Sequence, residues 1–177
     1  MDVSVAMEGM GFDVILGRDL TREGMQKTTA EFADAARKAD VALFYYAGHD
    51  FQVGGQNYLV PTDAAISRAD QATTQTIAMS DILRVMATAP GLKLVVLDAC
   101  RNNPFGAALA GTPDQGNGLA RIGTEADVLF VYATQPGNVA YDGTGRNSFF
   151  TGALLNHLYT PGQQISETMI AVRRDVM

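Results

Sequence analysis

The chain has a single cysteine, Cys100, two histidines and no tryptophan among its 177 residues. One cysteine excludes an intramolecular disulfide and any zinc site built from several thiolates. With only His49 and His157 available, a histidine-based metal cluster is not expected either. The glycines form no phosphate-binding or dinucleotide-binding motif. The sequence therefore predicts neither a metal nor a cofactor.

Basic residues are also few, because 13 Lys and Arg stand against 19 Asp and Glu, for a net charge of -6. Such a chain repels a phosphate backbone, so a nucleic-acid partner is not expected. Its longest apolar runs, over residues 41–47 and 92–97, are far shorter than the ~20 residues of a membrane helix. No membrane span is predicted in this chain, and the sequence gives no basis for naming a cell compartment.

What the chain does contain is an alternation of helical and strand-like apolar patterns. Helical spacing predicts helices over residues 2–10, 22–38, 81–89, 149–159 and 165–176. Continuous apolar runs predict strands over 12–16, 41–46, 92–97 and 127–134, and the Gly54-Gly55 pair predicts a hairpin within 51–61. Thr21, Ser80, and either Asn147 or Ser148 are the expected N-caps. We therefore expect one α/β domain with a mainly parallel sheet covered on both faces.

Two reactive side chains follow predicted strands. His49 comes after the strand 41–46 and Cys100 after the strand 92–97. A lone cysteine is most often a small buried hydrophobe, yet both residues stand at strand ends near glycine or polar residues, where core filling is poor. In parallel sheets ligands bind beyond the carboxyl ends of the strands. We expect His49 and Cys100 to face one another there, across neighbouring strands.

Three blocks of sequence carry a resemblance to a known family. "FYYAGHDFQVGGQNYLVPTDA" at 44–64 resembles the histidine block of caspase-like cysteine peptidases. "VVLDACRNNPF" at 95–105 resembles their cysteine block, and "VYATQPGNVAYDGTGRNSFFTGALLNHL" at 131–158 is similar to their small-subunit segment. The likeness is greatest to bacterial metacaspase and paracaspase relatives, called orthocaspases. It implies a three-layer α/β/α sandwich and a cysteine endopeptidase.

By this resemblance His49 and Cys100 form the dyad, an acyl-enzyme is the intermediate, and the backbone N–H groups of Cys100 and Asp50 stabilise the oxyanion. Asp50 departs from the family, which has glycine after the histidine. A negative φ and a side chain in solvent would make this change mild. Otherwise one misplaced oxyanion donor costs about 2.7–4 kcal/mol. The alternative function is a catalytically impaired module that binds peptides or protein partners.

Two acidic residues bear on specificity. Asp98 matches the acid that lines the S1 pocket of metacaspases and paracaspases, and Asp142 falls where caspases carry an arginine. The resemblance therefore implies protein or peptide substrates with Arg or Lys at P1. The alternatives are a strand-end carboxylate bound by backbone amides for Asp98, and an ordinary turn residue for Asp142. An unrelated α/β enzyme with a cysteine nucleophile, such as an amidase, is a third possibility.

Domain organisation follows from the same patterns. Residues 1–177 are expected to form one peptidase domain, with a long inter-block surface loop over 106–124 that offers Arg121 as a site of self-cleavage. No EF-hand-like loop is present, so no calcium site is predicted. The family has a central strand before its first helix, whereas this sequence begins within a helix and ends within "VRRDVM". We therefore expect a domain that lacks its first central strand and is truncated at both ends.

Overall fold

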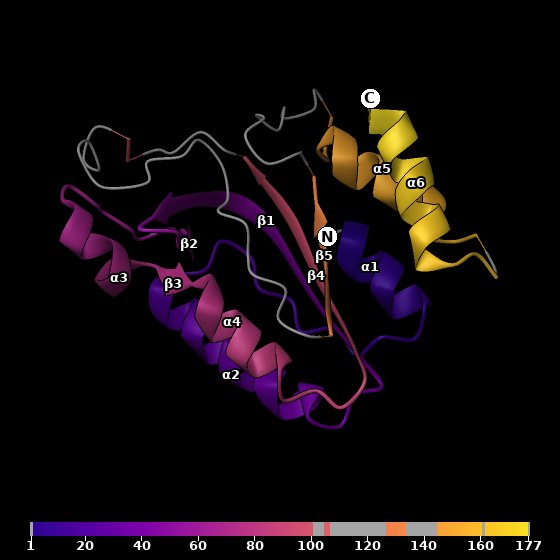
Figure 1. Ribbon diagram of the computed structural model, residues 1–177, viewed down its shortest axis with the longest axis horizontal. Helices are drawn as coiled ribbons and strands as arrows, with labels where there is room; N and C mark the ends of the chain where they lie inside the picture. The colour runs from indigo at the N-terminus through magenta and orange to yellow at the C-terminus, as the bar shows by residue number, and fades with distance from the viewer. Residues whose placement is uncertain (1, 101–104, 107–126, 134–144, 161, 177) are drawn as a thin grey trace. The chain divides into compact units, whose positions relative to one another are not determined.

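The computed structural model describes residues 2–100, 105–106, 127–133, 145–160 and 162–176, and its α-helices and β-strands are labelled in Figure 1. The chain divides into two compact units, one of residues 1–16 with 141–177 and the other of residues 17–140. The first unit contains the helices α1 (Asp2–Gly9), α5 (Phe149–His157) and α6 (Ile165–Val176). The second contains α2 (Arg22–Ala36), β1 (Val41–Val53), β2 (Gln56–Leu59), η1 (Ala69–Gln71), α3 (Ala72–Gln75), β3 (Ile77–Ala78), α4 (Met79–Met86), β4 (Leu92–Cys100) and β5 (Val128–Tyr132).

The five described strands form one mixed sheet in the order β3-β2-β1-β4-β5. Strands β1, β4 and β5 run parallel to one another, while β2 and β3 extend the sheet with antiparallel pairing. The crossover from β1 to β4 contains helix α4, as parallel pairing requires. The predicted α/β fold class is confirmed, with a parallel part that holds the strands of the two reactive residues.

Strand β1 is longer than expected and has two partners. Its first nine residues pair with β4, and its last four pair with β2. The predicted strand 41–46 and the first arm of the predicted hairpin are therefore one continuous strand. The hairpin itself is confirmed, because Gly54 and Gly55 connect Val53 to Gln56 with φ angles of 57° and 73°. Two successive positive φ angles are what a type I′ turn needs, and glycine adopts them without steric cost.

Helices α2 and α4 pack on one face of this sheet, as Figure 1 shows. The buried side chains of this layer come from β4 and from both helices, and they include Ala36, Met79, Ile82, Met86, Val95 and Leu97. Phe32 of α2 meets Phe44 of β1 at a ring-centroid distance of 6.4 Å. Alternate residues of β1 and β4 reach this core, so the strands are locked in register by their apolar faces.

Two side chains cap helix α2. The Thr21 hydroxyl accepts a hydrogen bond from the Gly24 N–H at 3.2 Å, which confirms the predicted cap. Asp63 adds a second one, since its Oδ1 accepts from the Arg22 N–H at 2.8 Å. A helix leaves its first four N–H groups without helical partners, and these two contacts satisfy two of them.

The predicted cap of α4 by Ser80 is wrong. The helix begins at Met79, and its N-cap is Ala78, which makes no side-chain capping bond. Met79 is 2% exposed within the core, and β3 leads directly into the helix. Ser80 therefore lies inside the first turn of the helix and not at its N-cap.

The predicted strand over residues 12–16 is also wrong. These residues have no regular secondary structure, although their apolar pattern is strand-like. A strand requires a partner that accepts and donates its backbone hydrogen bonds. None of the ladders in the described part of the chain includes this segment.

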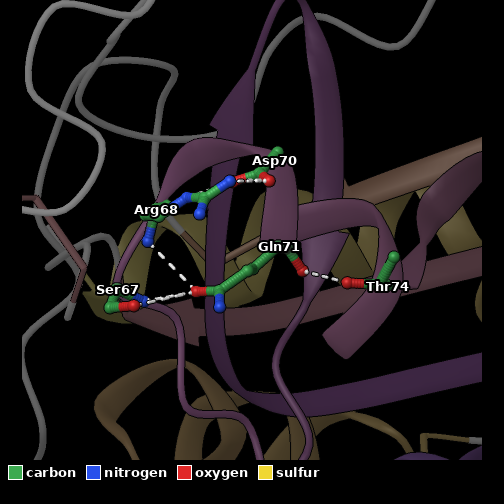
Figure 2. Close-up of polar contacts among 5 residues, drawn as sticks. All are labelled: Ser67, Arg68, Asp70, Gln71 and Thr74. Atoms are coloured by element: carbon green, nitrogen blue, oxygen red, sulfur yellow. Dashed lines mark hydrogen bonds and ion pairs between the residues drawn. The ribbon is translucent and has the colours of Figure 1, made fainter.

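A polar turn precedes η1 and α3, and Figure 2 shows its contacts. The Gln71 side-chain oxygen accepts from the N–H groups of Ser67 at 2.8 Å and Arg68 at 3.1 Å. The Thr74 hydroxyl in turn donates to the Gln71 carbonyl at 3.1 Å. One side chain therefore satisfies several backbone groups of a segment that lacks a ladder.

The other unit is an arrangement of three helices. Ser148 caps α5 by accepting from the Thr151 N–H at 2.9 Å, as predicted for Asn147 or Ser148. Asp2 of α1 accepts from Arg146 at 2.8 Å and from Asn147 at 2.9 Å. His157 Nε2 lies 2.6 Å from Asp175 Oδ2 and joins α5 to α6. No helix in the described ranges is long and apolar enough to cross a membrane.

Candidate active site

His49 and Cys100 are paired residues of two neighbouring parallel strands. The β1–β4 ladder runs from Val41 opposite Leu92 to His49 opposite Cys100, where it ends. Neighbouring strands lie about 4.8 Å apart, so residues in register are close at the level of the backbone. The ladder thus brings together the two reactive residues that the sequence singled out, at the carboxyl end of both strands.

The position of His49 within the strand differs from the expectation. It does not follow a finished strand but lies inside β1, at the point where pairing passes from β4 to β2. Its carbonyl oxygen accepts from the Val60 N–H at 3.0 Å, and its side chain is exposed. Cys100 is the last residue of β4, three positions beyond the predicted strand end. Both residues are therefore carried by sheet backbone and not by loops.

Asp50 is the buried carboxylate beside this pair. It is 1% exposed, and it is absent from the described non-glycine residues with positive φ, which are Asp19 and Asp127. The negative φ removes the need for glycine at this position. The side chain, however, does not lie in solvent, which was the second condition for a mild substitution. Any effect of Asp50 on chemistry therefore comes from its buried carboxyl group and not from backbone strain.

Asp98 lies two residues before Cys100 on β4 and is 8% exposed. Its register partner is Ala47, two residues before His49. The hydroxyl of Tyr45 donates to its Oδ2 at 3.4 Å. A carboxyl group at this depth requires polar partners, and Tyr45 is one of them.

Phe51, Tyr58 and Phe105 form an aromatic cluster. Phe51, two residues after His49, stacks on Tyr58 of β2 at a centroid distance of 5.5 Å. Phe105, five residues after Cys100, meets the same Phe51 ring edge-on at 5.7 Å. Such contacts contribute beyond their buried area. Phe51 and Phe105, which follow His49 and Cys100 along the chain, are therefore packed against each other.

Two further residues were not identified from the sequence. Tyr46 donates a hydrogen bond to the His49 carbonyl at 2.7 Å, and Gly48 leaves the space that its ring occupies. Their signal in the sequence is a tyrosine two positions before a glycine in a strand, since residues i and i+2 share a face. Asp142, Arg121 and the part of the inter-block loop from 107 to 124 lie outside the described residues.

No group of three or more His, Cys, Asp or Glu side chains within the described ranges is arranged to hold a metal ion. The chemistry that the described residues suggest is nucleophilic. Cys100, His49 and the buried Asp98 lie toward the carboxyl ends of two paired parallel strands. Cys100 and His49 are partners in the register of these strands. Covalent catalysis by a cysteine uses these residue types, a thiol as nucleophile and a general base beside it.

The same residues can be compared with known proteins. Chicken (Gallus gallus) caspase-7 is 29% identical over 185 aligned residues, which cover 97% of this chain. The human "mucosa-associated lymphoid tissue lymphoma translocation protein 1" is 29% identical over 135 residues, or 75% of this chain, and its mouse homologue matches to the same extent. The chain spans 56% of the length of caspase-7 and 15% of the length of the other two proteins.

The family match is broader than any of these pairwise matches. The model of the caspase domain aligns with residues 2–177, which includes both strands of the candidate site and all three helices of the smaller unit. This match excludes the third possibility from the sequence, an unrelated α/β enzyme such as an amidase. The chain belongs to the caspase-domain family of cysteine-type peptidases.

Proposed function

We propose that the chain is a cysteine endopeptidase that cleaves peptide bonds after Arg or Lys, with Cys100 as nucleophile and His49 as general base. The observation that carries this proposal is the register of His49 opposite Cys100 in a chain of the caspase-domain family. A free thiol has a pKa of ~8.5, so at neutral pH it is mostly protonated. An imidazole beside it accepts the proton during attack and makes the thiol an effective nucleophile.

The reaction proceeds in two stages. The Cys100 sulfur attacks the carbonyl carbon of the substrate while its proton passes to His49. The carbon–nitrogen bond then breaks as His49 returns that proton to the leaving amine, which leaves a thioester. Water, deprotonated by His49, attacks the thioester carbonyl and releases the acid product and the Cys100 thiol. Both stages pass through a tetrahedral oxyanion.

The oxyanion is assigned to the backbone N–H groups of Asp50 and Cys100. Successive residues direct their backbone groups to opposite edges of a strand. The His49 carbonyl is bonded to Val60 next to β2, so the Asp50 N–H points to the β4 side. The Leu97 carbonyl accepts from Ala133 next to β5, so the Cys100 N–H points to the β1 side. Both N–H groups therefore point into the β1–β4 ladder, which extends to the pair of His49 and Cys100, so their assignment as oxyanion donors rests on the resemblance.

Specificity for a basic P1 residue is assigned to Asp98, together with Asp142. The support for Asp98 is its burial next to the strand end that carries Cys100, where a carboxylate attracts a guanidinium or ammonium group. Asp142 lies outside the described residues, and its role rests on the resemblance alone.

The direct test compares two fluorogenic peptides that differ only at P1, one with arginine and one with aspartate. Cleavage of the arginyl peptide should exceed that of the aspartyl peptide, and Cys100→Ala and His49→Ala should each abolish it. Preference for the aspartyl peptide would contradict the assignment of Asp98. Cleavage that survives Cys100→Ala would contradict the assignment of the nucleophile.

The buried position of Asp50 favours a second candidate function, a caspase-like module that binds peptides without efficient turnover. A negative charge near a forming oxyanion opposes the charge that develops in the transition state, and loss of such stabilisation costs about a hundredfold or more in rate. Binding of the substrate ground state, which carries no oxyanion, is not opposed in this way.

Two variants separate the candidates. Asp50→Gly restores the residue that the family has, and Asp50→Asn removes the charge while keeping the size. If the natural chain binds an arginyl peptide but cleaves it only after either change, the binding function is correct and the charge is responsible. If the natural chain already cleaves at a rate within a few-fold of both variants, the peptidase function is correct.

A further inference from the structure

We propose that Tyr46 is a positioning residue for His49, because its hydroxyl fixes the His49 backbone, and that Gly48 is required at the active-site strand because it makes room for the Tyr46 ring. This inference rests on the proposed peptidase function. It adds to the dyad a residue that contacts neither the substrate nor the reacting atoms in the proposed mechanism.

The contacts converge on one carbonyl group. The Tyr46 hydroxyl donates to the His49 carbonyl oxygen at 2.7 Å and lies 3.3 Å from the Val60 carbonyl oxygen. The Val60 N–H donates to the same His49 oxygen at 3.0 Å. A carbonyl oxygen has two lone pairs, so both acceptor sites of His49 are used. The backbone of the general base is therefore held both from its own strand and from the segment that follows β2.

The position of these contacts matters because β1 changes partners there. Up to His49 the strand pairs with β4, and from Asp50 onward it pairs with β2. A strand that loses one neighbour keeps its direction only through the contacts that remain. The Tyr46 hydroxyl bridges this change, and small displacements of a catalytic base reduce the rate strongly.

Gly48 permits the contact for reasons of space. A Cβ atom built at position 48 would lie 2.7 Å from the Tyr46 hydroxyl oxygen and 2.9 Å from Cζ of the ring. Gly48 is not among the described glycines with positive φ, so conformational freedom is not the cause. The ring of Tyr46 lies across Gly48 and reaches the residue after it. Any side chain at this position has to displace the ring.

The hydroxyl remains a donor over the working pH range. Burial raises the pKa of Tyr46 far above its ordinary value, and the nearby negative charge of Asp50 raises that pKa further. The phenol therefore keeps its proton wherever a cysteine peptidase operates. Its ring also packs against the core cluster of the sheet and α4, a contact that phenylalanine would retain. Tyr46→Phe thus removes the hydrogen bond with little loss of packing.

The test uses the chain with Tyr46→Phe, with Gly48→Ala and with both changes, and Tyr159→Phe serves as the matched control. Tyr159 is 55% exposed at the end of α5, so removal of its hydroxyl should leave activity unchanged. Two readouts are taken for each protein. They are kcat and KM for the arginyl peptide, and the pH profile of Cys100 alkylation by iodoacetamide, which reports thiol activation without turnover.

Tyr46→Phe should lower kcat about tenfold with KM within about twofold, because a positioning contact acts on the transition state. Its alkylation profile should move toward that of a free thiol, and His49→Ala defines the limit of that movement. Gly48→Ala should reproduce both effects by displacing the ring. The double variant should lose no more than the more affected single variant, because both changes break one contact.

The outcomes are distinguishable. If the natural chain cleaves the peptide and Tyr46→Phe matches it in kcat and in the alkylation profile, the role of Tyr46 is rejected while the peptidase function stands. If kcat falls only in proportion to unfolded protein, as judged from thermal melts, the role is structural and the proposal is wrong. If the natural chain shows neither cleavage nor His49-dependent alkylation, the peptidase function fails, and the proposal fails with it.

Discussion

The hydroxyl of Tyr45 donates a hydrogen bond to Oδ2 of Asp98 at 3.4 Å, across 53 positions of sequence. The two residues meet because β1 and β4 are neighbours, with Ala47 opposite Asp98. Tyr46, the next residue, contacts the His49 carbonyl instead. Successive strand residues point to opposite faces, so the two adjacent tyrosines support different parts of the candidate site. Tyr45 contacts the side chain of Asp98, and Tyr46 contacts the backbone of His49.

Asp98→Asn should remove the preference for basic P1 residues. A charge-assisted hydrogen bond contributes about 1.5–3 kcal/mol, so kcat/KM for the arginyl peptide should fall by about 10- to 100-fold. A peptide with a neutral P1 residue should be affected much less. The measurement is kcat/KM for both peptides with each protein.

The control for that change is Asp81→Asn. Asp81 is an exposed carboxylate on α4 that pairs with Arg84 at 2.8 Å, and such surface pairs contribute little. This variant should cleave both peptides as the natural chain does. An equal loss for arginyl and neutral peptides in Asp98→Asn would show that Asp98 supports the fold of the strand end and not the S1 pocket.

Gly91→Ala should destabilise the chain. A Cβ atom at position 91 would lie 1.8 Å from the Asp40 carbonyl oxygen, and residues 40 and 91 directly precede the neighbouring strands β1 and β4. The same oxygen accepts from the Leu92 N–H at 2.9 Å, which begins the β1–β4 contact. Overpacking costs about 1–3 kcal/mol, and here the clashing atom is backbone, so the upper part of that range is expected. Urea unfolding measures the change.

Substitution of a second glycine, Gly152, should have the opposite effect on stability. Gly152 lies within α5, has no atom within 4 Å of an added Cβ, and is not among the described glycines with positive φ. Gly152→Ala should therefore stabilise the chain by up to about 1 kcal/mol through helix propensity. If both substitutions destabilise equally, backbone approach at Gly91 is not the cause of its effect.

Much of this fold was accessible from apolar periodicity, and the failures share a cause. The helix α2 and the strand β4 were predicted because each contains a long periodic or continuous apolar run. The short elements α3 and β3 were not, since four and two residues carry no period. Residues 12–16 have the pattern of a strand without a described partner. Pairing partners are a tertiary property, which local pattern does not contain.

For the candidate site too, the residue types were predictable from the sequence and their spatial arrangement was not. His49, Cys100 and Asp98 were identified by residue type, by their place after apolar runs and by resemblance. Their register was not predictable, because it depends on nine consecutive pairs between β1 and β4. The burial of Asp50 and the reach of Tyr46 across Gly48 were missed for a related reason. Both depend on the position in β1 at which pairing with β4 ends and pairing with β2 begins. The sequence of one segment does not determine that position.

Removal of the two caps of α2 should destabilise the larger unit. Thr21→Ala frees the Gly24 N–H, and Asp63→Ala frees the Arg22 N–H. Each loss is expected to cost about 1 kcal/mol, as for other N-cap substitutions. The two acceptors serve different N–H groups, so the double variant should lose roughly the sum. The free energy of unfolding from urea titration checks both values, and Thr74→Ala, on the short helix α3, is the control with a smaller expected loss.

The contact between His157 and Asp175 predicts a pH dependence of stability. The hydrogen bond from His157 lowers the pKa of Asp175, and the positive charges of His157 and Arg174 lower it further. A carboxyl group whose pKa is lower in the folded chain stabilises the fold above its unfolded pKa of about 3.9, and that contribution disappears as the pH falls through the folded value. Asp175→Asn should therefore be less stable than the natural chain at pH values near 6, well above that unfolded pKa, and should match it at strongly acidic pH.

The partner of Asp175 is tested by repeating the comparison in a His157→Ala background. The hydrogen bond from His157 is the largest cause of the lowered pKa of Asp175. Most of the pH-dependent difference in stability caused by Asp175→Asn should therefore vanish when the imidazole is absent. A difference that persists unchanged would assign the effect to Arg174, whose Nε lies 3.7 Å from Asp175 Oδ1. Thermal unfolding of the natural chain, both single variants and the double variant at a series of pH values measures the coupling between α5 and α6.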